Sequence, residues 1–442
     1  MQINTRLNAT HHYSNDKRGG QSAFARLLNA DIVILLLLAV EAAPLIIPEG
    51  LATISPLFYT AMHSLRYLSF LVIALHYILE YTRNRSIESP IYLAIIILIF
   101  ISLRTAYYGN LSITSIMPYM MLLFSGLFIC ANKGRLDKVM LVVLPILEIW
   151  AYINLIAVIT FPDGMYYSDN TGYTKNWIFG YKSSFQYYLL PAMIFALLNF
   201  SYRKQRIRTA SLIVACLAQT ILAGNMMLAV VAISIIAIFF SRIFKSTNIF
   251  NYITYITVII IVNYIAIFGL SLFLNTELGN AFLSTLGKGA DIGSRASVIW
   301  PLTLSYIPNN PIFGYGVVPS SIRVLQYSNV RGAIHSHNQT LELLYVGGIV
   351  LFILFAIFVA IIVIKLYRTK NLPTSQILAL GMFGLFLCVV VEVFVREIAF
   401  PIWVMLFICY WSTDLHEQLS QRQEVQALVG KSFFRRGNEA WR

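Results

Sequence analysis

The chain has 442 residues, of which 58% are hydrophobic and only 12% are charged. Soluble domains carry about 25% charged residues, so this composition excludes an ordinary soluble protein. Apolar runs close to the roughly 20 residues that cross a bilayer recur from end to end. We therefore expect an all-α polytopic membrane protein, and a β-barrel is excluded because its strands would appear as alternating segments of about ten residues.

The net charge of +13 does not indicate a nucleic-acid partner, because of where the cations lie. Lys and Arg gather in the N-terminal arm, in short connections between apolar runs and in the C-terminal tail, which is the positive-inside pattern of membrane proteins. The connections marked as cytoplasmic by this rule carry Arg83/Arg85, Lys133/Arg135/Lys138, Arg203/Lys204/Arg206/Arg208, Arg242/Lys245 and Lys365/Arg368/Lys370.

Residues 1–30 are polar and are expected to form a cytoplasmic arm, not a cleaved signal. A membrane domain is expected over residues 31–411 and a cytoplasmic tail over residues 412–442. The apolar runs predict membrane-crossing segments at 31–47, 57–80, 91–108, 111–130, 139–160, 185–201, 210–240, 249–274, 341–365 and 376–411.

Two of these segments, 210–240 and 376–411, are flanked by basic clusters on both sides, so each must cross the membrane an even number of times. We expect fold-backs near Gly224-Asn225 and Arg396-Glu397, which gives about twelve crossings with both termini in the cytoplasm. Each half of 210–240 spans only about 22 Å at 1.5 Å per residue. Its turn should therefore lie below the outer surface and line a cavity open to the outside.

Two outer loops are long enough to form a site, at residues 161–184 and 275–340. The first is rich in Tyr and contains Trp177; such aromatics form an interfacial belt or stack on sugars, and both readings stay open. The second contains an amphipathic stretch, 296–307, which predicts a re-entrant or interfacial helix. Turn-forming residues follow at 308–311 and at Gly314-Tyr315-Gly316.

The cysteines and the missing motifs exclude several kinds of chemistry. Disulfides and a cysteine metal site are not expected, because the four cysteines lie in apolar runs without metal-ligand spacing; these are Cys130, Cys216, Cys388 and Cys409. The sequence has no P-loop, no GxSxG, no HExxH and no pair of Asp residues two positions apart. We therefore expect no cofactor and no metal.

His335 and His337 lie at the end of the longest polar interval, directly before an apolar helix. The run from Ser336 to Gln339 fits a capping box, which predicts Ser336 as the N-cap and places His337 and Asn338 in the first helical turn. The positive helix end would keep the imidazole neutral, which suits a general base, and would attract phosphate. The alternative is that these residues only cap the helix.

Cations in the outer loops break the positive-inside trend and could grip a diphosphate; among them are Lys175, Lys182, Arg295 and Arg331. For Lys175 and Arg323, a solvated loop charge is the favoured reading. Two further cations, Arg66 and Arg104, lie inside predicted spans, where charge is costly and usually faces a cavity or a partner. Candidate partners for them are Glu41, Glu148 and Glu392.

Five groups of residues together resemble the O-antigen ligase/polymerase superfamily: Ile292-Gly293-Ser294-Arg295, Ile299-Trp300, Pro311-Ile312-Phe313-Gly314-Tyr315-Gly316, His337-Asn338-Gln339-Thr340-Leu341-Glu342 and Gly347-Gly348-Ile349. The chain departs from the pattern at two places. Leu351 replaces a further glycine, and Gly224-Asn225 stands where many members have Ser-Arg. The role of that second arginine is therefore unassigned, with Lys182 or Arg66 as candidates.

The resemblance implies a metal-independent inverting glycosyltransferase in a bacterial inner membrane, acting on undecaprenyl-diphosphate-linked glycans. It implies that Arg295 holds the diphosphate and that His337 acts near the acceptor hydroxyl. We expect a catalytic role for His335 as well, since it lies two residues from His337. Substrate-binding roles are expected for Arg331, Asn338, Lys182, Lys175 and Tyr315. The implied partners are membrane lipid, a chain-length regulator and a flippase, with no nucleic acid.

Three functions remain open at this point. The first is a polymerase that joins lipid-linked repeat units into O-antigen or capsular polysaccharide. The second is a ligase that transfers finished glycan to lipid A core. The third belongs to another class, a transporter or flippase of lipid-linked glycans, which Arg66, Arg104 and the short hairpin at 210–240 would suit.

Overall fold

The computed structural model describes residues 31–84, 87–168, 173–203, 205–241, 295–327 and 334–424, with shorter stretches between 257 and 281. Arg331, the N-terminal arm, most of the expected span at 249–274 and the end of the C-terminal tail lie outside the described residues. Predictions made for those segments remain predictions.

The described chain is mostly helical. After a helix at 31–42, the elements are η1 (Ala43–Leu45), α2 (Leu51–Ile54), α3 (Pro56–Asn84), α4 (Ser89–Tyr107), α5 (Ile113–Ala131), η2 (Lys133–Arg135), α6 (Leu136–Thr160), β1 (Tyr166–Ser168), β2 (Tyr173–Trp177), β3 (Gly180–Tyr181), η3 (Lys182–Ser184), α7 (Gln186–Arg203), α8 (Arg206–Leu222), α9 (Met226–Phe240), η5 (Ile265–Gly269), η6 (Arg295–Ile299), α15 (Trp300–Tyr306), η7 (Ile307–Asn309), α16 (Ser320–Gln326), α17 (Gln339–Arg368), α18 (Pro373–Cys388) and α19 (Phe400–Tyr410). A last helix covers 412–424.

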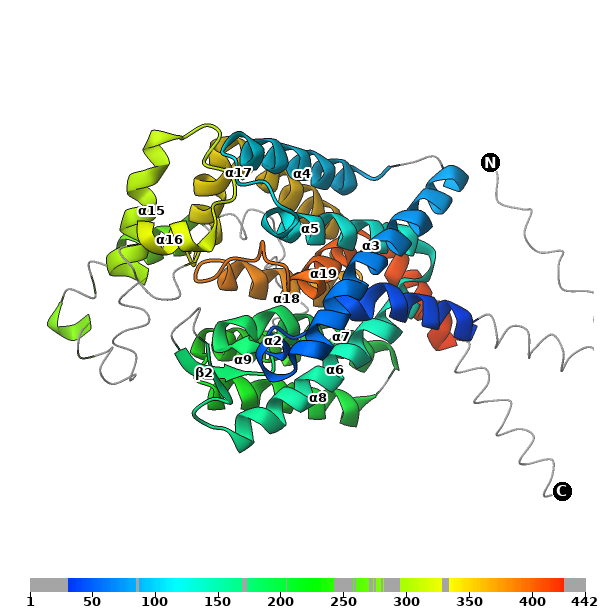
Figure 1. Cartoon of the computed structure of the whole chain (residues 1–442). Helices are drawn as coiled ribbons and strands as arrows, with labels where there is room; N and C mark the ends of the chain where they lie inside the picture. The colour runs from blue at the N-terminus through cyan, green and yellow to red at the C-terminus, as the bar shows by residue number, and fades with distance from the viewer. Residues whose placement is uncertain are drawn as a thin grey trace, which may run out of the picture.

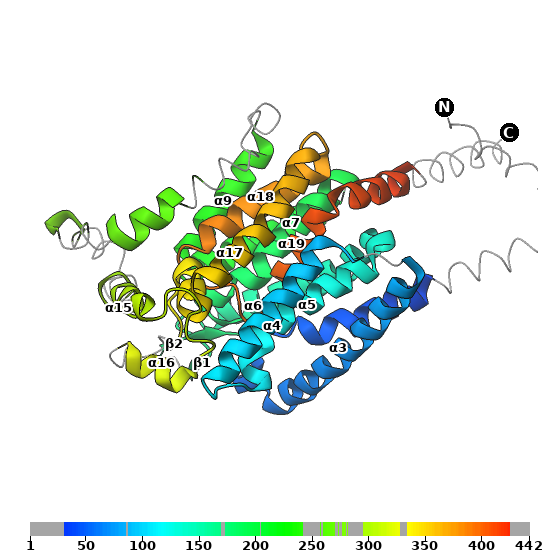
Figure 2. The ribbon, with the colours of Figure 1, turned by 90° about the horizontal axis from the view of Figure 1, so that it is seen from above.

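The helices form a multi-pass membrane protein. Within the described residues, the helices long and apolar enough to cross a bilayer number 5, with shorter apolar helices beside them, among them α9, α18 and α19. This agrees with the predicted helical membrane fold, while the number of twelve crossings stays a prediction. Figures 1 and 2 place α15, α16 and the strands at one end of the molecule and helix 412–424 at the opposite end. That arrangement is compatible with outer loops on one side and the tail on the other.

Both fold-backs lie where the sequence predicts them. Gly224 turns the chain between α8 and α9 with φ of 72°, and Asn225 caps α9 by accepting a hydrogen bond from Leu228 N–H. The Asn225 amide also donates to the carbonyl of Lys182 at 2.7 Å, which ties this turn to the first outer loop. The second fold-back is an irregular connection at 389–399 between α18 and α19.

The first outer loop departs from the all-α expectation. It forms a small sheet of three strands in the order β1-β2-β3, paired antiparallel. Trp177 is 0% exposed, and its indole N–H donates to the Phe161 carbonyl at 2.7 Å. Neither a membrane belt nor a sugar platform fits a buried indole, so both readings were wrong for Trp177, which anchors the loop instead.

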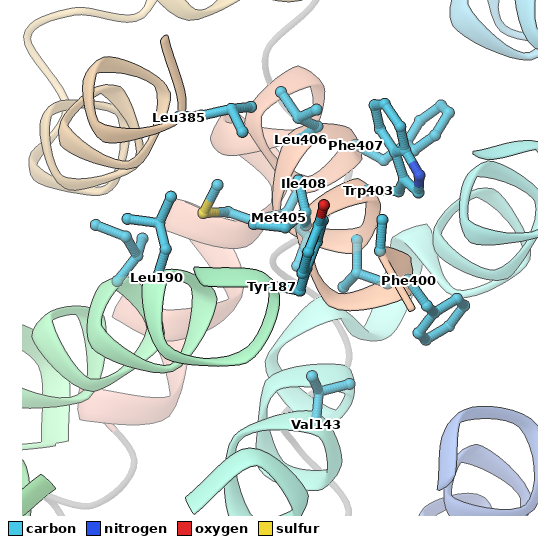
Figure 3. Packing of buried hydrophobic residues seen from close by; sticks show 14 of the residues in the cluster. Val143, Tyr187, Leu190, Leu385, Phe400, Trp403, Met405, Leu406, Phe407 and Ile408 are labelled. Carbon is cyan, nitrogen blue, oxygen red and sulfur yellow. The ribbon is translucent and has the colours of Figure 1, made fainter. Parts of the chain in front are cut away.

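The core lies around α7 and α19, whose residues are apolar on every face and almost all buried. Helices of this kind must be surrounded by other helices. Figure 3 shows Tyr187 and Leu190 of α7 facing Met405 and Ile408 of α19. By contrast, α3 exposes many large apolar side chains on one side, as Leu57 and Leu79 do, which suits a helix that faces lipid.

Close backbone packing explains two glycines of the motif, Gly314 and Gly348. Residues 311–316 run against α17, where Tyr315 N–H donates to the Tyr345 carbonyl at 3.0 Å and Gly316 N–H donates to the Val346 carbonyl at 2.8 Å. A Cβ on Gly314 would lie 2.5 Å from the Gly347 nitrogen, and one on Gly348 would lie 2.3 Å from the Ile312 oxygen. Backbone can approach this closely only because both positions lack side chains.

Replacing Gly348 with alanine is therefore expected to destabilise the fold. Gly348 has φ of 62° inside α17, where a Cβ is both strained and in collision with backbone, so a loss of about 2 kcal/mol or more is expected. Thermal unfolding in detergent and the yield of folded protein would measure it. Gly134→Ala is the matched control, because nothing lies within 4 Å of the Cβ position there; equal melting of the two variants would contradict the packing argument.

Candidate active site

The segment before α17 is capped differently from the prediction. Asn338, not Ser336, is the N-cap, and its side-chain oxygen accepts a hydrogen bond from Leu341 N–H. The Ser336 hydroxyl instead donates to the Asn338 carbonyl at 2.8 Å. His337 consequently lies before the helix, not in its first turn, so the helix end does not account for its protonation state.

A buried ion pair stabilises the segment that precedes α17. Glu342 of α17 accepts a hydrogen bond from Ser336 N–H at 2.9 Å and another from Arg323 at 2.6 Å. The Arg323 guanidinium lies over the Tyr345 ring, 3.7 Å from its centroid, and is almost fully buried. The expectation of a solvated loop charge at Arg323 was therefore wrong, because α16 packs this side chain against α17.

The second fold-back packs on the same helix start. Gln339 N–H donates to the Val389 carbonyl at 2.9 Å, and its side-chain oxygen accepts from Phe394 N–H at 2.6 Å. The Asn338 amide donates to the Val390 carbonyl at 2.9 Å. These bonds bring Glu392 beneath the two histidines. They also hold the Asn338 side chain in place, and its expected contact with substrate stays a prediction.

Four charged or titratable side chains meet at this point; we call Arg295, His335, His337 and Glu392 the imidazole cluster. His335 Nε2 lies 3.4 Å from one Glu392 oxygen, and His337 Nδ1 lies 3.5 Å from the other. The Arg295 guanidinium approaches Glu392 at 3.9 Å and donates to the Val391 carbonyl at 2.8 Å. The structure thus brings together the three residues for which catalytic roles were predicted.

His337 is held in an unusual conformation. It has φ of 50°, the one positive value outside glycine in the described chain, and its N–H donates to His335 Nδ1 at 3.2 Å. A bulky residue at positive φ is strained, and such strain gathers at functional sites. In addition, His337 Nδ1 and the Glu392 oxygen that it faces at 3.5 Å are both buried with no other hydrogen-bond partner in the described structure. The Glu392 carboxylate is therefore placed to orient the His337 ring.

Desolvation favours the neutral form of both imidazoles. Desolvation lowers the pKa of His337, and the Arg295 charge lowers it further, while Glu392 acts in the opposite direction. Burial and the neighbouring imidazole lower the pKa of His335 well below its ordinary range. A neutral imidazole at physiological pH can accept a proton, which is what a general base requires.

The dependence of activity on pH should reveal the lowered pKa of His337. If neutral His337 is the base, the acidic limb of kcat/KM should have its midpoint below the ordinary histidine pKa of about 6.5, since the lowered pKa keeps the base free at lower pH. Glu392→Gln removes the charge that raises the pKa of His337, so the limb should move to still lower pH. Initial rates between pH 4.5 and 8 measure both; a midpoint above 6.5 would contradict the assignment.

Two imidazoles and one carboxylate can also bind a metal. His335, His337 and Glu392 each offer one ligand atom, and these atoms lie within 4.8 Å of one another. Catalytic zinc and non-haem iron use such sets. The Arg295 charge, 3.9 Å from the same carboxylate, opposes a second cation there.

The other residues predicted to bind substrate differ in their exposure and contacts. Lys175 is exposed on β2, and the Lys182 ammonium lies 5.5 Å from the Tyr181 ring centroid. Tyr315 stacks on Tyr345 with centroids 5.0 Å apart and donates its hydroxyl to the Tyr306 carbonyl at 3.0 Å, so packing accounts for it. Arg331 lies outside the described residues.

Glu392 is the main site residue that the sequence interpretation missed, since it was considered only as a partner for Arg66 or Arg104. A carboxylate near a predicted fold-back inside an apolar segment was the available signal. The proposed partners were also wrong for Arg66, which pairs with Glu397. Glu41 instead bonds His76 at 2.7 Å, and Glu148 pairs with Arg208.

Residues 183–356 match a family model described as O-antigen ligase. The match supports the O-antigen ligase/polymerase superfamily. The match includes Arg295, both histidines and the paired glycines, whereas Glu392 lies beyond it. No curated protein matches the chain. The match supports a glycosyltransferase-like function on lipid-linked glycans at a membrane. It does not distinguish polymerases from ligases, because the superfamily includes both.

Proposed function

We propose that this chain is a metal-independent inverting glycosyltransferase that polymerises undecaprenyl-diphosphate-linked repeat units at the outer face of the bacterial inner membrane. The product would be O-antigen or capsular polysaccharide. The observation that carries the proposal is the meeting of Arg295 and two buried imidazoles on one carboxylate, within and beside the region matched by the family.

The proposed reaction is one displacement at the anomeric carbon. His337 takes the proton of the acceptor hydroxyl as its oxygen attacks. The bond between the anomeric carbon and the diphosphate oxygen breaks, with inversion, and the electron pair leaves on undecaprenyl diphosphate. Arg295 stabilises the charge that develops on that leaving group. Glu392 orients both imidazoles and balances the charge of the protonated base, so it acts as a positioning residue.

Purified protein in detergent or nanodiscs, supplied with a defined lipid-linked repeat unit, tests the proposal. A ladder of polymer should form at equal rates with and without EDTA. Activity that is lost in EDTA and restored by zinc would contradict the metal-free mechanism and would give His335, His337 and Glu392 the role of ligands. Movement of the lipid-linked unit across the membrane without polymer would favour a transporter instead.

The family description favours one second candidate, a ligase that passes finished glycan to lipid A core. Deletion in the host separates the two by the banding of lipopolysaccharide on a gel. Loss of a polymerase should leave lipopolysaccharide capped with single repeats, whereas loss of a ligase should remove all of the glycan.

A further inference from the structure

The second fold-back carries another group of charges just beyond Glu392. Arg396 donates to Glu49 at 3.0 Å, and Glu397 pairs with Arg66 of α3 at 3.6 Å. We call Glu49, Arg66, Arg396 and Glu397 the second charged cluster. It joins α3 and the turn before α2 to the same connection that carries Glu392, yet the reaction proposed above uses none of its members.

Arg66 is the residue of this cluster that indicates a binding site. Its side chain is 0% exposed, and none of its three guanidinium nitrogens has a hydrogen-bond partner among the residues that the structure describes. Arg208, in contrast, places its guanidinium on Glu148 with two hydrogen bonds. A buried guanidinium without hydrogen bonds costs several kcal/mol. Glu397 offsets the charge of Arg66 but leaves those donors unused.

The charges of the cluster decide which ligand chemistry fits. Two guanidinium groups face two carboxylates, so the cluster is formally neutral, which disfavours a diphosphate with its multiple negative charges. A sugar is different, because each hydroxyl both donates and accepts a hydrogen bond. Arg66 supplies unused donors, while Glu397 and Glu49, whose side chains are 39% and 37% exposed, supply acceptors.

Aromatic rings lie beside these groups on the same helix. Tyr59 and His63 precede Arg66 by about two turns and one turn of α3, so they share its face, and their rings lie 5.8 Å apart. Both are partly exposed. The rings of Tyr59 and His63 can present an apolar surface to the face of a sugar ring. The charged groups of the cluster can then form hydrogen bonds with the sugar hydroxyls.

The position relative to the imidazole cluster suits one extended substrate. Glu397 follows Glu392 by five residues (397 − 392 = 5), so their Cα atoms are at most about 18 Å apart. A lipid-linked oligosaccharide that reacts at Arg295 and His337 would place further sugars within this range. The connection at 389–399 would then hold the reacting bond at one end and the flanking sugars at the other.

We propose that Glu49, Arg66, Arg396 and Glu397 form a subsite that binds the sugar hydroxyls of the lipid-linked oligosaccharide. The proposal rests on the proposed function, which supplies the glycan. It assigns recognition of the glycan to the second charged cluster and recognition of the diphosphate to Arg295.

Binding to the full-length protein in nanodiscs tests the subsite without catalysis. The probes are the repeat-unit oligosaccharide of the host, freed from lipid and diphosphate by mild acid, and undecaprenyl diphosphate. Glu397→Gln and Arg66→Lys are expected to weaken binding of the oligosaccharide by about tenfold or more, the effect of losing a hydrogen bond to a charged group. The Kd for undecaprenyl diphosphate should stay unchanged. Asp163→Asn, which removes an exposed carboxyl elsewhere in the outer loops, should affect neither probe.

Several outcomes would overturn the subsite. One is unchanged oligosaccharide binding in Glu397→Gln, which keeps the test valid even if Arg66→Lys fails to fold, because the Glu397 side chain is 39% exposed. Another is weaker binding of undecaprenyl diphosphate alone, which would make the cluster a diphosphate site. Absence of polymer from native protein that still binds the oligosaccharide through Glu397 would contradict the proposed function and leave the subsite intact.

Discussion

Replacing His337 with asparagine is expected to lower the rate of polymer formation by about 10²–10⁴-fold, the usual contribution of a general base. Asparagine is preferred to alanine because His337 has φ of 50°, and asparagine tolerates that conformation. The variant therefore removes the proton acceptor while it keeps the backbone. Initial rates with a defined lipid-linked repeat unit measure the loss.

His335 provides an informative comparison for that experiment. Its Nδ1 accepts the His337 N–H at 3.2 Å, so His335→Ala removes a group that orients the base without removing the base. We expect a smaller loss of kcat than in His337→Asn, with the same melting temperature in detergent. Full-length polymer from the His337 variant would contradict the assignment of His337 as the base, whatever the behaviour of His335.

Replacing Arg295 with alanine is expected to lower kcat by about 10²–10³-fold, because the leaving diphosphate would lose its stabilising charge. Arg295→Lys should recover only part of the rate, since a lysine cannot bind two phosphate oxygens in the fork geometry of a guanidinium. Turnover of the lipid-linked repeat unit and the Kd for undecaprenyl diphosphate should change together. Arg83→Ala, with a side chain that is 78% exposed, is the matched control for the loss of one positive charge.

A structural explanation for that loss can be separated from a catalytic one. Arg295 approaches the buried Glu392 at 3.9 Å, so its removal leaves a carboxylate with less compensation, which destabilises a fold. The double variant Arg295→Ala, Glu392→Gln removes that uncompensated charge. If it melts like the native protein and still fails to turn over, the guanidinium acts on the substrate. Recovery of the rate in the double variant would show that Arg295 serves only to neutralise Glu392.

Local features of the chain were enough to predict the class of fold and the places where the chain turns back. Length and apolarity of a run depend on neighbouring residues alone, and basic flanks report which ends lie together on one side of a membrane. The fold-backs at Gly224-Asn225 and Arg396-Glu397 followed from those two signals. The run from His335 to Glu342 was likewise recognisable, because its motif is contiguous.

Contacts between distant segments were beyond such reasoning. Ser336 and Asn338 are both good N-caps, and the choice between them depends on hydrogen bonds that join Asn338 and Gln339 to residues of the second fold-back. Burial of Arg323 required α16 to pack on α17, and burial of Trp177 required a hairpin to form in the first outer loop.

Glu392 shows most clearly the difference between what a sequence pattern predicts and what contacts between distant segments decide. In the sequence it lies in an apolar run more than fifty residues after the histidines, and nothing in that run indicates the histidines as its partners. Packing of the connection at 389–399 on the start of α17 sets its carboxylate against two imidazoles and a guanidinium. Patterns within one run of residues are enough for helices and turns, but the partner of a buried charge is chosen by the segments that meet around it.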